Sequence, residues 1–205
     1  MKNNKINNIK EYFVDLGLPS GLKWAKCNLG AETETDYGNY YMWGSTEPNT
    51  ADECTWEHAP FNNGSDTFER KYFNAYKSEW LDDNGNLKSE YDAATQIMGD
   101  GWRMPTKADF QELLDNTDNE WVTINDVDGW KFTSKTNGNS IFIPFSGKRL
   151  DSSFFFQGTF GNVWSSSLDT EEPYFAWYLR FSEDRVYADY YESRDFGFVV
   201  RGVME

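Results

Sequence analysis

Cysteine and histidine are scarce in this sequence of 205 residues, which holds two cysteines and one histidine. The cysteines, Cys27 and Cys54, permit one disulfide but do not imply it. Because a chain of this length can bury a core without covalent staples, we expect both to be free thiols. A catalytic triad built on the histidine, His58, would need a nucleophilic serine or cysteine in a G-x-S-x-G-like context, which the sequence lacks. We therefore interpret His58 as a loop residue.

Basic residues are also scarce relative to acidic ones. Lysine and arginine together number 19 against 34 aspartates and glutamates, which gives a net charge of −15. Nucleic acids and anionic membrane surfaces are bound by clustered lysine and arginine, so this balance argues against both partners. The charge itself favours solubility and says nothing about the fold.

Long apolar runs are missing as well. No stretch approaches the ~20 apolar residues of a membrane-spanning helix, so we expect no membrane insertion. Residues 1–8 contain no apolar segment of the kind found in signal peptides. With no signal peptide visible, we expect the protein on a virion or on a cell surface reached by another export route, and otherwise in the cytoplasm.

Aromatic residues, in contrast, are abundant and make up 18% of the chain, with nine Trp, twelve Tyr and sixteen Phe. A core does not need so many. Tyrosine and tryptophan offer large, stiff, amphipathic contact area, which suits a binding surface. The composition therefore favours a protein that binds a ligand.

The chain divides into a polar segment, 1–11, which we expect to be flexible, and one α+β domain over 12–205. No internal repeat or linker interrupts the domain. We predict strands at 12–18 and 22–29, a short strand at 40–43, and then a long irregular loop. Two short helices are predicted, at 91–98 and 106–116. The rest is β-rich, with a turn at 126–129, a tight hairpin at Asn137–Gly138, and strands at 121–124, 130–134, 141–145, 154–156, 163–166, 175–181, 185–190 and 196–203.

The stretch Gly99–Leu114 carries the strongest local signals. Its two glycines suit a tight turn, and Pro105 makes the residue before it extended. Thr106 is a good N-cap, and Asp109 three residues later completes a variant of the capping box. The apolar residues from Phe110 onward share one helical face. These signals predict a well-capped helix.

The same stretch resembles the G-x-R-L-P-T-E-A-E-W-E element of the formylglycine-generating-enzyme branch of the C-type lectin fold. It resembles even more closely the W-R-M-P-T-K-A-E-F-x-E-L element of the Fibrobacter succinogenes major paralogous domains, which are common in gut Bacteroidetes and their phages. Four more segments agree in the family's order: VDLGLPSGLKWA at 14–25, DYGNYYMWG at 36–44, WSSS at 164–167 and GFVVR at 197–201. The resemblance spans about 13–203.

This resemblance implies a C-type-lectin-like fold in which the strand at 13–16 or at 22–25 pairs with the strand at 199–203. It does not imply an activity. Formylglycine-generating enzymes use a late cysteine pair, and no cysteine follows Cys54. The related iron enzymes need several histidines. We therefore expect a non-enzymatic protein without metal or cofactor, while an enzyme of that branch and a structural virion or pilus component remain the alternatives.

Two short motifs resemble ligand sites, and we interpret both as turns. Glu47-Pro48-Asn49 matches the sugar-binding triplet of calcium-dependent lectins, but no Trp-Asn-Asp follows late in the chain. Asp82, Asn84 and Asn86 have the spacing that opens a calcium loop, but Leu87 stands where such a loop needs glycine. A turn at Asn84–Gly85 accounts for the second motif.

The region Asp151–Asp195 interleaves polar residues with large aromatics. Alternation along 175–181 puts one set on one face, Phe175, Trp177, Leu179 and Phe181, and another set on the opposite face, Ala176, Tyr178 and Arg180. Along 185–191, we expect Val186, Ala188 and Tyr190 to face inward and Arg185, Tyr187, Asp189 and Tyr191 to face outward. Five residues should be core: Trp102, Trp164, Leu179, Phe181 and Val200.

An outward surface of Tyr, Arg, Asp and Ser combines stiff anchors with adaptable polar groups. The predicted ligand-binding residues are Phe155, Tyr174, Tyr178, Arg180, Arg185, Tyr187, Asp189, Tyr191 and Ser193, with Phe154, Phe156 and Asn162 as neighbours. The alternative is an aromatic-rich core with a few exposed rings.

The position of this surface in the chain sharpens the functional expectation. The last third of the fold is where variable proteins of diversity-generating retroelements carry their randomised positions, and the mixture of residues here looks similar. The resemblance thus implies such a variable protein, or a phage or bacterial receptor-binding protein or adhesin. Its partner would be a protein or glycan on a cell surface, and its oligomeric state is left open.

Overall fold

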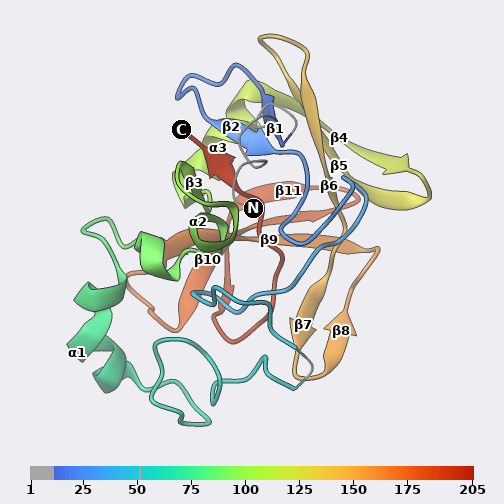
Figure 1. The fold of residues 1–205 in the computed structure, drawn as a ribbon. Coiled ribbons are helices and arrows are strands. Elements are labelled where there is room, and N and C mark those ends of the chain that lie inside the picture. Colours follow the sequence, from blue (N-terminus) through green and yellow to red (C-terminus); the bar gives the residue numbers. More distant parts are fainter. Residues whose placement is uncertain (1–11, 51) are drawn as a thin grey trace, which may run out of the picture.

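The computed structural model describes residues 12–50 and 52–205, so the segment 1–11 lies outside the described residues. The chain has a mixed α+β fold with few helices and mostly antiparallel strands, as the sequence predicts (Figure 1). Among the described residues, no helix is long and apolar enough to cross a membrane.

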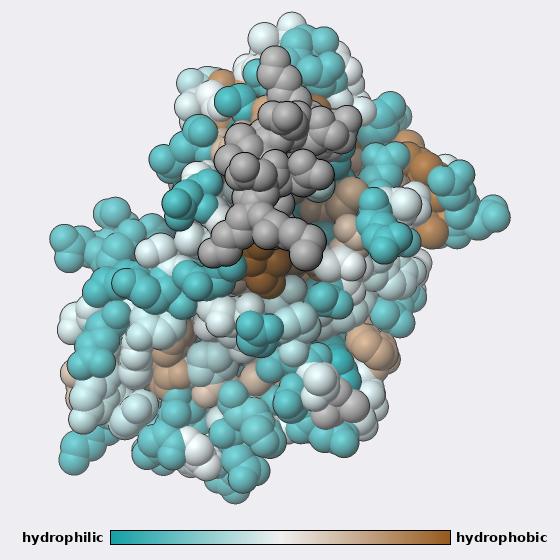
Figure 2. Space-filling model, in the orientation of Figure 1, coloured by the Kyte–Doolittle hydropathy of each residue, from teal (hydrophilic) through white to brown (hydrophobic). Residues whose placement is uncertain are grey.

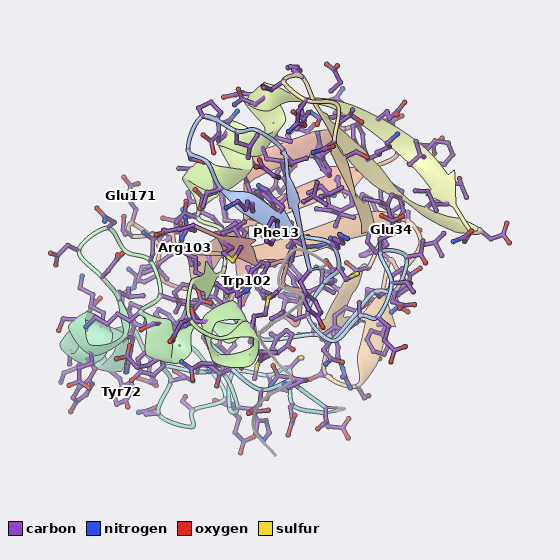
Figure 3. All side chains as sticks on the ribbon, turned by 45° about the horizontal axis from the view of Figure 1, so that its top comes forward. Phe13, Glu34, Tyr72, Trp102, Arg103 and Glu171 are labelled. Atoms are coloured by element: carbon purple, nitrogen blue, oxygen red, sulfur yellow. The ribbon has the colours of Figure 1, made fainter. Side chains whose placement is uncertain are left out.

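Strands near the two ends of the described chain meet in one sheet with the order β1-β2-β12-β3. Its strands are β1 (Phe13–Asp15), β2 (Lys23–Ala25), β12 (Val203–Met204) and β3 (Trp102–Arg103). Val203 lies opposite Trp24 on one side and Arg103 on the other. The predicted pairing of an early strand with the last strand is confirmed, and the Trp102–Arg103 stretch joins them (Figure 3).

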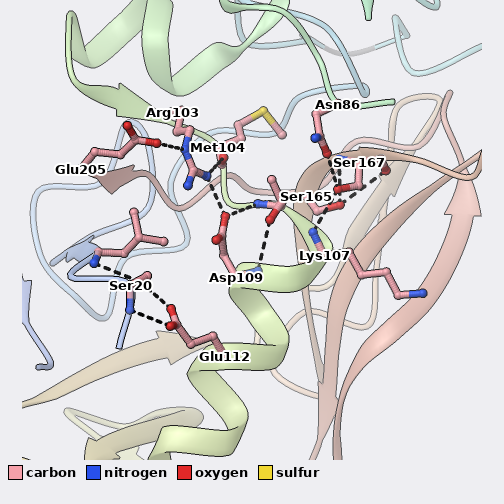
Figure 4. A network of polar contacts seen from close by, with 12 residues as sticks. Ser20, Asn86, Arg103, Met104, Lys107, Asp109, Glu112, Ser165, Ser167 and Glu205 are labelled. Atoms are coloured by element: carbon pink, nitrogen blue, oxygen red, sulfur yellow. Dashed lines mark hydrogen bonds and ion pairs between the residues drawn. The ribbon is translucent and has the colours of Figure 1, made fainter. Parts of the chain in front are cut away.

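Helix α3 (Lys107–Asn116) begins where the sequence predicts, with Thr106 as its N-cap. The Thr106 hydroxyl accepts a hydrogen bond from the Asp109 amide, and the Asp109 carboxylate accepts one from the Thr106 amide. Arg103 then binds Asp109 at 2.7 Å and Glu205 at 3.1 Å (Figure 4). The capping box therefore also holds the C-terminal strand against the start of α3.

The sequence predicts two early helices, and the structure contains a further one. The predicted helix at 91–98 is α2 (Ala93–Met98), capped by Asp92 and preceded by the 3-10 turn η2 (Ser89–Tyr91). The unexpected helix is α1 (Arg70–Trp80). It begins after Glu69 without a side-chain cap and ends without glycine, so the usual start and stop signals are missing. Buried Phe73 and Trp80 hold it in place instead.

A second sheet, in the order β4-β5-β6, protrudes from the body of the molecule (Figure 1). It consists of β4 (Thr117–Ile124), β5 (Val127–Ser134) and β6 (Ser140–Pro144). The tight turn lies at Asn125 and Asp126, both with positive φ, and not at 126–129 as predicted. The Asn137–Gly138 hairpin exists, but its loop spans residues 135–139 and is not a two-residue turn.

The central sheet, in the order β11-β10-β9, is covered on both faces. Its strands are β9 (Phe160–Leu168), β10 (Phe175–Ser182) and β11 (Val186–Ser193), and the small hairpin β7 (Lys148–Leu150) and β8 (Ser153–Phe155) precedes them. One face packs against α3 and β5 through Leu179 and Phe181. The other packs against α1 and the long loop through Trp164 and Tyr178. All five residues predicted as core are buried.

The segments predicted as strands at 40–43 and 196–203 are mostly irregular. Tyr41 and Phe198 form a single bridge, and Val199 bridges Val163. Buried Arg201 explains how this irregular backbone is tied down, because its guanidinium donates to Asn28 and to the carbonyl oxygens of neighbouring segments.

Both cysteines are free thiols, as expected. Cys27 is half-buried and Cys54 is fully buried, where desolvation raises the pKa of the Cys54 thiol to about 11. A thiol with so high a pKa is almost entirely protonated at neutral pH, so it behaves as an inert core group.

Candidate ligand-binding site

A β-bulge in β11 decides which side chains reach the surface. Tyr178 lies opposite Tyr190, and Arg180 lies opposite Tyr187. These two pairs are two residues apart along β10 but three residues apart along β11, so β11 contains one extra residue between them. Because of this extra residue, side chains after the bulge in β11 point to the face opposite to the one that simple alternation predicts. Tyr190, which we expected to face inward with Ala188, instead shares a face with Arg180 and Tyr187, and 37% of it is exposed.

This face forms a hollow of about 360 Å³, which we call the Arg180 hollow. Phe160, Asn162 and Arg180 come from the central sheet, with buried Tyr178 at its floor. Phe156 and Lys148 approach from the hairpin before it. A smaller hollow of about 220 Å³ adjoins it and shares Arg180 and Tyr190 with it. The remaining residues of the smaller hollow are Ser182, Asp184, Arg185 and Tyr187.

Arg180 lies between two aromatic rings at the centre of this surface. Its guanidinium carbon is 4.6 Å from the centroid of Tyr190 and 5.0 Å from that of Phe160. Each such cation–π contact contributes about 0.5–1 kcal/mol at an exposed site, so the rings hold the guanidinium in place. Neither Arg180 nor its neighbour Arg185 forms an ion pair with another described residue.

Arg185 is held by a different contact. Its Nη1 donates a hydrogen bond of 3.1 Å to the Tyr187 hydroxyl, and this bond raises the pKa of the guanidinium. At the other end of the hollow, Lys148 binds Glu192 at 3.1 Å and lies 4.1 Å from the Phe196 ring centroid. The lysine is therefore already paired, whereas the two arginines keep their charge available for a ligand.

Three predicted site residues are structural. Tyr178 is 4% exposed and packs on Trp164 and Phe198, where burial raises the pKa of its phenol. Ser193 is buried and donates its hydroxyl proton to Asp195. Tyr174 is half-buried, and its hydroxyl accepts a hydrogen bond from the Trp56 indole at 3.3 Å. Alternation wrongly placed Tyr178 outside because the second core covers that face too.

Tyr191 is exposed but lies on the other side of the central sheet. Its ring contacts Phe175 at 5.1 Å and Trp177 at 5.5 Å, and Lys107 of α3 sits over the Trp177 ring. The bulge separates it from Tyr187, with which simple alternation grouped it. Tyr191 therefore packs mainly on that side of the sheet, but it also lines the Arg180 hollow, as predicted.

The remaining predicted residues fall on or beside the Arg180 hollow. Arg180, Arg185 and Tyr187 line the two hollows, as do the neighbours Phe156 and Asn162. Phe155 is exposed next to Phe156, and Asp189 is exposed next to Tyr190. Phe154 is exposed in β8 and packs on Tyr40.

Sequence reasoning missed four residues that line the hollow: Lys148, Phe160, Tyr190 and Glu192. No local signal marks the bulge that exposes Tyr190, since neither glycine nor proline occurs there. Lys148 and Glu192 meet only through the tertiary fold. An aromatic run next to a glycine-rich loop was the only available hint for Phe160.

Of the two short motifs that resemble ligand sites, Asp82–Asn86 is a turn, as interpreted, whereas Glu47-Pro48-Asn49 is irregular backbone that begins in a bend. The Asp82 carboxylate accepts the amides of Asn84 and Asn86 at 2.9 and 2.8 Å, which is an Asx-type turn. The Asn49 side chain accepts the Met42 amide. His58 contacts the Thr55 hydroxyl at 3.0 Å within the long loop. Over residues 12–50 and 52–205, no group of three or more His, Cys, Asp or Glu side chains is placed to hold a metal ion.

Comparison with protein-family models, with curated proteins and with solved structures finds no match to this chain.

Proposed function

We propose that this protein is a non-enzymatic ligand-binding module that binds a protein or glycan on a cell surface through the Arg180 hollow. The observation that carries the proposal is Arg180 itself, a half-buried guanidinium held between Tyr190 and Phe160 without a carboxylate partner among the described residues. Tyrosine and arginine dominate the energetics of recognition surfaces because they combine large contact area with directed hydrogen bonds.

A C-type-lectin-like architecture supports this role. The five segments that resemble the Fibrobacter paralogous domains occur in the family's order, and the pairing of β2 with β12 brings the ends of the described chain together. In such a fold the last third presents the ligand-binding surface, which is where Arg180, Tyr187 and Tyr190 lie. We infer a variable protein of a diversity-generating retroelement, or a phage or bacterial receptor-binding protein.

The decisive experiment compares two alanine variants, Arg180→Ala and Tyr190→Ala, for binding to bacterial surface extracts and to a glycan array. Each anchor should account for about 2 kcal/mol, so each variant should weaken binding by roughly thirtyfold. Tyr76→Ala is the matched control, because Tyr76 is a tyrosine of similar exposure on α1, 42% against 37% for Tyr190. Tyr178 is tested as Tyr178→Phe, because its ring is part of the core.

The outcomes separate the alternatives. Loss of binding after protease treatment of the extract identifies a protein ligand, and signals on the array identify a glycan. Folded Arg180 and Tyr190 variants that bind as well as the parent would place the site elsewhere. Stoichiometric copper together with oxidase turnover would instead establish the enzyme of the formylglycine-generating branch.

A further inference from the structure

A separate hollow, of about 490 Å³, lies beside α1, and we call it the α1 hollow. It is bounded by α1, by the turn 81–88 and by the loop 168–173. Its floor is apolar and consists of the buried residues Phe73, Leu81, Leu168 and Pro173. Figure 3 places Tyr72 of α1 and Glu171 of the loop on the same side of the molecule. None of the residues that line this hollow line the Arg180 hollow.

The rim of the α1 hollow is polar, and much of its hydrogen-bonding capacity is unused. Five side chains on the rim form no hydrogen bond or ion pair with another described residue: Asn74, Lys77, Ser78, Asp83 and Thr170. The other two charged rim residues are already engaged. Asp82 accepts backbone amides, and Lys88 donates to the Ser78 carbonyl oxygen at 2.7 Å.

The walls of the α1 hollow are tied to one another, so its shape exists before any ligand binds. Arg70 of α1 forms an ion pair with Glu172 of the loop. Asp169 accepts the amides of Glu171 and Glu172, which fixes the bend of that loop. Gly85 adopts a positive φ of 79° and lies so close to Thr170 that a Cβ atom would be 2.8 Å from its methyl group. A preformed hollow avoids the entropy cost of ordering loops on binding.

The polar rim and the apolar floor of the α1 hollow limit the kinds of ligand that it can bind. The rim offers an ammonium donor at Lys77, a carboxylate acceptor at Asp83, an amide and two hydroxyls, with one unpaired charge of each sign. A purely apolar ligand would bury these groups without partners, which is unfavourable. An anion would meet Asp83, and a cation would meet Lys77. A neutral ligand with many hydroxyls and one apolar face matches both rim and floor.

We propose that the α1 hollow is a saccharide-binding site that accommodates one or two neutral sugar residues. The C–H face of the sugar lies on the accessible edges of Leu81, Leu168 and Pro173, beneath which Phe73 is fully buried. Its hydroxyls exchange hydrogen bonds with Asn74, Asp83 and Thr170 at the rim. For so small a ligand the affinity is weak, in the millimolar range.

The test is a titration of the isotope-labelled protein with glucose, galactose, mannose, N-acetylglucosamine and their disaccharides, followed by amide NMR. We expect saturable shifts for one of these sugars at the amides of α1, Gly85 and Thr170. Asn74→Ala and Thr170→Val should each weaken this binding about tenfold without changing the folded spectrum. Ser78→Trp, which places a large side chain in the hollow from an exposed helix position, should abolish it.

Two controls distinguish this proposal from the proposed function. Lys71→Ala removes an exposed α1 residue that does not line the hollow and should leave sugar binding unchanged. Tyr190→Ala should weaken binding at the Arg180 hollow and also leave the α1 shifts unchanged. If no sugar of the panel shifts the α1 amides, or if Ser78→Trp binds as well as the parent, the proposal is wrong, whatever happens at the Arg180 hollow.

Discussion

At the scale of single residues, Arg194 shows how this protein uses its surplus of aromatic rings. Its guanidinium carbon lies 4.7–5.6 Å from the ring centroids of Phe73, Phe68, Trp56 and Trp43. It is fully buried, and it donates to the carbonyl oxygens of Pro173 and Pro60. Burial lowers the pKa of this arginine to about 9. Aromatic faces and carbonyl dipoles thus replace the carboxylate that a buried cation usually needs.

Tyr40 gives a prediction at the same scale. Its hydroxyl donates to the Ser146 carbonyl oxygen and accepts from Gln157, and burial raises its pKa to about 12, against ~10 for an unfolded chain. A raised folded-state pKa contributes stability that is fully present below pH ~10 and is lost as the pH rises toward 12. We expect the free energy of unfolding, measured with urea, to fall by roughly 3 kcal/mol from this group across that window.

Tyr40→Phe isolates this contribution from other groups that titrate in alkali. The variant should lose about 1 kcal/mol at neutral pH, because Ser146 loses its donor. Its stability should then fall less steeply than that of the parent above pH ~10. Equal slopes for the two proteins would show that Tyr40 ionises normally in the folded state.

At the scale of elements, one inserted residue in β11 has the largest consequence. It moves Tyr190 to the Arg180 face and leaves Tyr191 against Trp177 on the opposite face. Bulges bend a strand and redirect its side chains, and here the rings of Tyr190 and Tyr191 contact different neighbours although both residues line the Arg180 hollow. The proposed binding surface is therefore a property of the β10–β11 pair and not of either strand alone.

The β4–β5 turn supplies the prediction for an element. Asn125 and Asp126 have φ values of 50° and 63°, the conformation in which the second position favours glycine. Asp126→Gly should therefore stabilise the protein by roughly 0.5–1 kcal/mol in thermal or urea unfolding, because relief of the left-handed strain exceeds the added chain entropy.

The control for Asp126→Gly is Asp118→Gly, at an exposed position within β4. There the backbone is extended, so glycine should destabilise by roughly 0.5–1 kcal/mol. Destabilisation by both substitutions would mean that the Asp126 side chain stabilises the turn by more than its backbone strain costs.

At the scale of the whole molecule, the large negative net charge has the strongest effect on solubility and stability. The net charge of −15 and the mainly hydrophilic face in Figure 2 favour solubility, but self-repulsion opposes the compact state. Arg180 and Arg185 form no ion pair with another described residue, but Asp184 lines the same hollow and offsets part of their charge.

Salt should consequently stabilise the fold. Raising sodium chloride from a few millimolar toward physiological strength shortens the screening length and weakens the repulsion between carboxylates. We expect the melting temperature to rise by about 3 °C, equivalent to about 1 kcal/mol. Sodium chloride is preferable to sulfate, which stabilises proteins by exclusion from their surface. A melting temperature that falls with sodium chloride would show that the ion pairs outweigh the repulsion.

The sequence by itself determined those features of the fold that depend on residues close to one another in the chain. Thr106 and Asp109 mark the start of α3 because the capping box joins neighbours in the chain. The α+β class, the pairing of the chain ends and the five core residues follow from strong local patterns and from family-like motifs. An aromatic and polar mixture in the sequence likewise predicted Arg180, Arg185 and Tyr187 as site residues, and the structure places all three along one hollow.

Only the tertiary structure decided which of the predicted residues form one surface. Alternation along β10 sorts side chains by face, but it cannot show that a second core buries Tyr178. The bulge that exposes Tyr190 depends on the register between two strands, and Lys148 meets Glu192 only because β7 lies near β11 in space. Burial and register are set by segments distant in sequence, so they cannot be predicted from the local pattern of a single strand.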